Sequence, residues 1–168
     1  MHPRQMNGKI AAALLLVMLA GCAGSGEGAG DGTRRSQASP KRIESALAMQ
    51  EVAPQRLSPG QCALVLWTKT QPPRRVLVAF SDPSVARVQI GGKTLDLPQT
   101  ARGGELVFGH TPRQSFEGDG ISMAFNLEFD TQSGLVGGAL APAGTLEYRS
   151  RKGWSSITAV AGIVGCEQ

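Results

Sequence analysis

The chain has 168 residues, of which 17 are Lys or Arg and 13 are Asp or Glu. Two of the basic residues, Arg4 and Lys9, precede residue 22, so the remainder carries 15 basic residues against 13 acidic ones. With that near balance, a single Tyr and no interleaving of basic and aromatic residues, the sequence gives no support to a nucleic-acid-binding surface.

The first segment has the pattern of a bacterial export signal. A basic start is followed by an apolar run over residues 10–20, which is shorter than the roughly 20 residues that a membrane-spanning helix needs. The run closes on Leu19-Ala20-Gly21-Cys22, which resembles the lipobox of bacterial lipoproteins. The resemblance implies cleavage before Cys22, diacylglycerol on its thiol and further acylation, for example with palmitate. Ala23 follows the cysteine in place of Asp, so the resemblance implies sorting to the outer membrane. The alternative to the lipoprotein interpretation is an ordinary secretory signal.

A tether is predicted between this signal and a folded domain. Residues 24–32 contain five glycines and no large apolar side chain, so they cannot bury enough surface to offset the entropy of ordering. Ser39 and Pro40 are a typical helix start, and a short helix is expected at about residues 40–50. The expected organisation is a signal peptide over 1–21, a lipidated tether over 22–55 and a β domain over 56–168.

Beyond residue 56 the apolar pattern changes to a period of two, which is typical of strands. Gly91-Gly92 predicts a tight hairpin turn, because primed turns need backbone freedom at both central positions. In residues 121–130 apolar and polar side chains alternate, which predicts one buried face and one wet face. The expected strands are residues 62–68, 75–80, 85–90, 93–97, 105–109, 114–117, 121–130, 145–150 and 154–164.

Cys62 and Cys166 are expected to form a disulfide, since export places them in an oxidising compartment. Two buried free thiols are the alternative. About eight short strands with regular turn signals predict an all-β antiparallel barrel or sandwich. Because the two cysteines open the first strand and end the last one, the bond would join these strands, and the barrel is mildly preferred over the sandwich.

The reactive side chains of the sequence favour a protein that is not an enzyme. His110 is the one histidine beyond the signal, and a solvated loop histidine is the preferred interpretation over a catalytic base in a hydrolase. Glu128 and Asp130 share a strand face, yet the alternation places them toward solvent. No ligand spacing for a metal is found, and no cofactor is expected.

Two resemblances concern the β domain. Residues 62–67 near the start, and Gly153-Trp154 and residues 161–166 at the end, resemble the ends of a group of short uncharacterised bacterial lipoproteins, for which no activity is known. The second is a fold-level likeness to the membrane-bound inhibitor of c-type lysozyme, an acylated small β-barrel with a disulfide. Ser133-Gly134 and Lys152-Gly153 match parts of that family's inhibitory pattern, but Gly137 stands where it has tyrosine.

The functional hypothesis is a lipid-anchored outer-membrane protein that faces the periplasm and acts as a non-enzymatic binding or envelope-structural module. Its expected partners are the membrane, through Cys22, and an envelope protein. The alternative is inhibition of a cell-wall hydrolase such as a c-type lysozyme. The candidate partner-binding residues are Trp67, Trp154, Arg149, Arg151 and Lys152, although either tryptophan could instead belong to the core or the seam.

Overall fold

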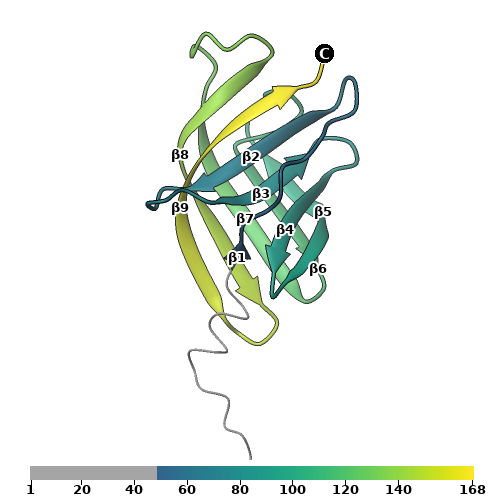
Figure 1. Ribbon diagram of the computed structural model, residues 1–168, viewed down its shortest axis with the longest axis vertical. Helices are drawn as coiled ribbons and strands as arrows, with labels where there is room; N and C mark the ends of the chain where they lie inside the picture. Colours follow the sequence, from purple (N-terminus) through teal and green to yellow (C-terminus); the bar gives the residue numbers. More distant parts are fainter. Residues whose placement is uncertain (1–48) are drawn as a thin grey trace, which may run out of the picture. The chain divides into compact units, whose positions relative to one another are not determined.

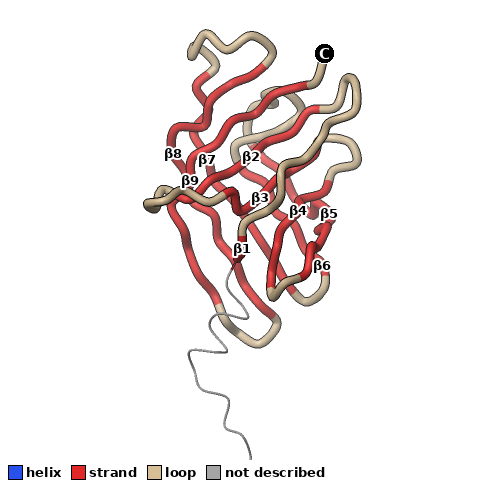
Figure 2. The backbone as a smooth tube through the Cα atoms, in the orientation of Figure 1, coloured by secondary structure: helices blue, strands red, loops and turns tan. Residues whose placement is uncertain are grey.

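The computed structural model describes residues 49–168, which form nine strands joined by turns and loops (Figures 1 and 2). Within this range no helix is long and apolar enough to cross a membrane. The strands are β1 Met49–Gln50, β2 Cys62–Thr68, β3 Arg75–Phe80, β4 Val85–Ile90, β5 Lys93–Gly103, β6 Arg113–Gly118, β7 Ile121–Asp130, β8 Gly138–Ser150 and β9 Ser155–Cys166.

Strands β2 to β9 form a closed barrel of eight antiparallel strands. Each pairs with the next along the chain, and β9 returns to pair with β2 over the full length of β2. The two-residue β1 is an addition to this circuit and pairs with the end of β4. The prediction of an antiparallel β fold is therefore confirmed, and the barrel is the correct choice over the sandwich.

The barrel interior is filled by the inward side chains of its strands. In β7 every second residue from Ile121 to Leu127 is buried, as the alternation predicted. The rings of Phe116 and Phe125 lie 5.8 Å apart between centroids, and Tyr148 is 2% exposed. These large side chains fill the centre of the barrel.

The predicted disulfide closes the seam of the barrel. Cys62 and Cys166 are register partners on β2 and β9, and their sulfur atoms are bonded. We call the end of the barrel that carries this bond the disulfide end; it also carries the loops of residues 81–84, 104–112 and 131–137. The opposite end carries the turns at residues 69–74, 91–92, 119–120 and 151–154, and Met49 enters there beside Ile90, so we call it the entry end.

Residues 51–61, here called the strap, run along the outer wall from the entry end to the disulfide end (Figure 1). Val52 is 1% exposed because it packs with Ala63, Val78 and Phe80 on the outward face of β2 and β3. Of the helix expected at about residues 40–50, only Met49 and Gln50 are described, and they form β1. The rest of that helix and the part of the expected tether before residue 49 lie outside the described residues, whereas residues 51–55 of the expected tether belong to the strap.

Residues with positive φ confirm one of the expected turns and overturn one of the expected strands. Gly91 and Gly92 have φ angles of 58° and 78° and connect β4 to β5, which confirms the hairpin. The strand predicted at residues 105–109 is wrong. Phe108 and Gly109 both have positive φ, so the chain reverses between Val107 and His110 and forms a loop over the disulfide end instead of a wall strand.

Candidate functional site

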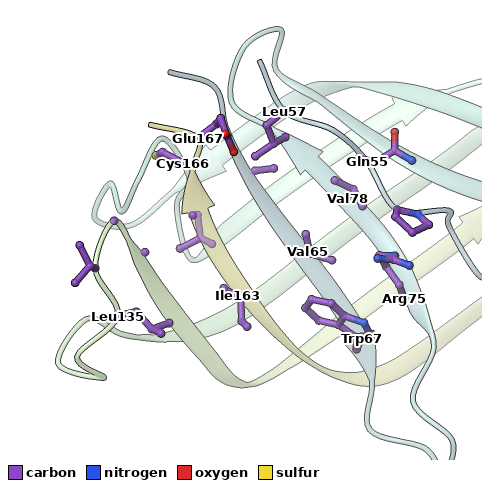
Figure 3. Close-up of a pocket in the computed structure, with 17 residues that line it drawn as sticks. Gln55, Leu57, Val65, Trp67, Arg75, Val78, Leu135, Ile163, Cys166 and Glu167 are labelled. Atoms are coloured by element: carbon purple, nitrogen blue, oxygen red, sulfur yellow. The ribbon is translucent and has the colours of Figure 1, made fainter. Parts of the chain in front are cut away.

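A groove of about 440 Å³ lies on the outer wall of the barrel between the strap, β2, β9 and the β7–β8 loop (Figure 3). Its lining is mainly apolar. Small residues, among them Ala63, Gly138 and Gly165, leave room for an occupant. Its large apolar side chains are Leu57, Val65, Trp67, Leu135, Val136 and Ile163.

The groove follows from the alternation of β2 and β9. In β2, Leu64 and Leu66 point into the barrel and are fully buried, so Val65 and Trp67 point outward. Val65 is the register partner of Ile163, which is 43% exposed. Two neighbouring strands thus present apolar side chains to the same outer face, and that face is only partly covered.

Backbone and side-chain hydrogen bonds fix the strap along one side of the groove. The Val52 N–H donates to the Arg75 carbonyl at 2.7 Å, and Arg75 Nε donates to the Val52 carbonyl at 2.9 Å. Farther along, Arg87 Nη1 donates to Gln55 Oε1 at 2.6 Å, while the same guanidinium pairs with Asp96 and lowers the pKa of that carboxyl. The strap therefore has a defined position, and so do its groove residues.

The other rim is joined to the disulfide end. The Cys166 N–H donates to the Gly137 carbonyl at 3.2 Å, which ties the β7–β8 loop to the end of β9. Between the glycines of this loop, Leu135 is 44% exposed and Val136 is 93% exposed. The loop thus extends the apolar lining of the groove outward into solvent.

Charged groups stand at the two ends of the groove. Figure 3 shows Arg75 beside Trp67 at one end and Glu167 beside Cys166 at the other. Arg75 also lies 3.9 Å from the carboxylate of Glu51, which is itself well exposed. An elongated occupant would therefore meet an apolar centre with a cation at one end and an anion at the other.

At the groove, β2 and β9 are hydrogen-bonded to a neighbour on each side. β2 pairs with both β3 and β9, and residues 160 and 162–165 of β9 pair with both β2 and β8. Neither of these strands has an open edge there to accept an added strand.

The structure places the predicted partner-binding residues in two separate regions. Trp67 lines the groove, whereas Arg149, Arg151, Lys152 and Trp154 lie at the tip of the β8–β9 hairpin. Arg149 donates through Nε to Glu147 at 2.8 Å, so its charge is partly neutralised.

Sequence reasoning did not select Leu135, Val136 or Ile163. The available signal was an apolar pair between loop glycines at residues 134–137, which is unusual because loop tips are normally polar.

His110 is not the solvated loop residue that the sequence suggested. It is 1% exposed beneath the disulfide end, where Nδ1 lies 3.3 Å from Gln114 Oε1. Burial lowers its pKa, and the hydrogen bond with Gln114 opposes this shift only in part. Among the described residues no group of three or more His, Cys, Asp or Glu side chains could hold a metal ion.

Fold and site together define a small closed up-and-down β-barrel with a filled interior and an apolar groove on its outer wall. No protein-family model, curated protein or solved structure matches the chain.

Proposed function

We propose that this protein is a lipid-anchored binding module of the bacterial outer membrane, whose barrel lies in the periplasm and holds an extended apolar segment of an envelope protein in the groove. The anchor is the lipidated Cys22, which becomes the first residue when the signal is cleaved. The proposal requires no reaction, cofactor or metal.

The observation that carries the binding role is the uncovered apolar wall at the groove. Solvent-exposed apolar surface is unfavourable by about 25 cal/mol for each Å² that could be buried, so a contiguous patch of it favours association. Ile163, Leu135 and Val136 are each more than 40% exposed and belong to one such surface. A volume of about 440 Å³ falls in the range of about 300–1,000 Å³ that is typical of binding sites.

The charges favour a peptide segment over a wholly apolar ligand. Arg75 and Glu167 stand at opposite ends of the groove, so an occupant with one acidic and one basic group flanking an apolar stretch would be held in a single direction (Figure 3). An extended segment of an envelope protein provides this chemistry, and the exposed β7–β8 loop provides further contact area beside it.

Charge substitution within the groove tests the binding role. Ile163→Glu places a carboxylate in the groove. The control Ile157→Glu makes the same change on the same face of β9 but six residues earlier, outside the groove. Ile157 is 71% exposed, so the control should not disturb the core. Each variant of residues 49–168 serves as bait for envelope extracts, and the retained protein is then titrated by calorimetry.

The expected result is one stoichiometric partner retained by the wild type and by Ile157→Glu but lost with Ile163→Glu. Its binding should show a negative heat-capacity change, because apolar surface is buried. Equal retention by all three baits would contradict the assignment of the groove.

The anchor is tested separately by growing cells with labelled palmitate. The wild-type chain should carry the label and fractionate with the outer membrane, whereas Cys22→Ser should carry none and be released. Label in both forms, or in neither, would remove the lipid-anchor proposal without affecting the groove.

A further inference from the structure

Charge is separated between the two ends of the barrel. The four turns of the entry end, together with Lys93 directly after the β4–β5 turn, contain five basic residues and a single acidic one, Asp119, and all six side chains are exposed. The basic residues are Lys69, Arg74, Lys93, Arg151 and Lys152.

The disulfide end has the opposite character. Its three loops and residues 167–168 contain Asp82, Glu105 and Glu167, all exposed, and neither lysine nor arginine. Directly beside the loops, Asp130 adds one acidic residue and Arg113 one basic residue, so the acidic excess remains. An anionic surface would therefore attract the entry end and repel the disulfide end.

The basic turns lie around the point where the chain enters the barrel. The Gly92 N–H donates to Gln50 Oε1 at 2.9 Å, so β1 contacts the β4–β5 turn directly before Lys93. The Arg151 N–H donates to the Gly120 carbonyl at 2.7 Å, which brings the β6–β7 and β8–β9 turns together. Met49, the first residue that the structure describes, therefore lies at the basic end of the barrel.

The tip of the β8–β9 hairpin adds an aromatic side chain to these charges. Trp154 follows Arg151 and Lys152 directly after the turn and is 41% exposed. Tryptophan next to cations suits the headgroup region of a bilayer, where the ring enters the interface and the charges meet phosphates.

From the charge separation, the entry point and Trp154, we infer that the entry end of the barrel docks on an anionic phospholipid surface. In this orientation the disulfide end points away from the membrane, and so does the end of the groove that carries Glu167. The inference uses the proposed anchor only to explain why this end meets the bilayer; the binding itself is independent of acylation.

The test uses residues 49–168, which contain the whole strand circuit, its core and its disulfide and thus fold as a unit without the anchor. Vesicles of phosphatidylcholine with about 30% phosphatidylglycerol should bind this chain, and vesicles of phosphatidylcholine alone should not. Binding should weaken steeply as salt is added, because the attraction between exposed charges is screened.

Charge reversal locates the contact. The double variant Arg151→Glu/Lys152→Glu should lower the partition coefficient at least about 25-fold, since each basic residue at such a surface contributes roughly fivefold. The control Arg56→Glu/Arg102→Glu makes the same change in net charge away from the entry-end turns and should have a much smaller effect. Circular dichroism verifies that both variants keep the β fold.

Brominated lipids give the orientation. In the Trp67→Phe variant, these lipids should quench the fluorescence of Trp154. In the variant Trp67→Phe/Trp154→Phe/Val136→Trp, the single tryptophan lies at the disulfide end and should not be quenched.

Equal losses in the two charge variants, equal binding to neutral vesicles, or quenching at position 136 would overturn the inference. The inference would also be overturned if the chain bound no vesicles but inhibited a c-type lysozyme through Arg151 and Lys152. In that case the basic end would fit the acidic cleft of the enzyme and not a membrane.

Discussion

Removing the disulfide should destabilise the barrel more than any single side-chain truncation on its surface. Cys62 and Cys166 are separated by 104 positions, and closing a loop of that length lowers the entropy of the unfolded chain by an amount worth about 4.7 kcal/mol at 25 °C. In the double variant Cys62→Ala/Cys166→Ala the unfolded chain regains this entropy, so the free energy of unfolding should fall by the same amount. With an m-value of roughly 1–3 kcal/mol/M, the urea midpoint should fall by about 1.6–4.7 M.

The assay is equilibrium urea unfolding of residues 49–168, followed by tryptophan fluorescence and by circular dichroism. Wild-type protein reduced with a thiol is the control, because it loses the cross-link but keeps both sulfur atoms. Both forms should lose similar stability and show a larger m-value than the oxidised protein, since the unfolded chain is then less compact. A midpoint shift below about 0.5 M would refute the loop-closure reasoning.

Three further predictions concern the interior of the barrel. Burial lowers the pKa of His110 in the folded state, so the unfolded chain takes up the proton first as the pH falls. The contribution of His110 to the free energy of unfolding should therefore be fully present above about pH 6.5 and be lost as the pH falls below that value. His110→Gln should flatten this decline when urea midpoints are measured across the pH range. Leu66→Ala, at a fully buried site, should cost about 2–5 kcal/mol in the same assay, and a loss comparable to that of the exposed Ile157→Ala would contradict this. Gly162→Ala should lower the Tm, because a Cβ there would lie 2.5 Å from the Val65 carbonyl oxygen; an unchanged Tm would show that the seam can widen.

Most of the wall could be predicted from the sequence because short-range patterns determine it. The alternation in β7 and the paired glycines between β4 and β5 specify which face is buried and where the chain turns, and both predictions match the structure. The seam was predictable for a different reason, since Cys62 and Cys166 carry long-range information that apolar periodicity lacks.

The errors occurred where tertiary contacts override the local pattern. Residues 105–109 have the composition of a strand, yet positive φ angles at Phe108 and Gly109 fold them over the disulfide end. His110 becomes buried as a result, which no property of its immediate neighbours indicates.

The groove was mostly beyond reach because it depends on the register of distant strands. That Val65 lies beside Ile163 follows from the closure of the barrel, and the position of Leu57 follows from the path of the strap across β2 and β3. Trp67 could be selected because tryptophan is rare in this chain, although its sequence context did not distinguish the seam from a binding surface.

The path of the strap also determines how the protein responds to mechanical force. A pull on the chain at Met49 would break the β1–β4 pairing first and then peel the strap from the wall, before the load reached Cys62 and the covalently closed barrel behind it. Because Gln55 and Leu57 of the strap line the groove, peeling would dismantle one side of the proposed binding site. An occupant that contacts the strap should raise the free energy needed to detach it, and tension that favours the detached strap should lower the affinity for the occupant by the same coupling.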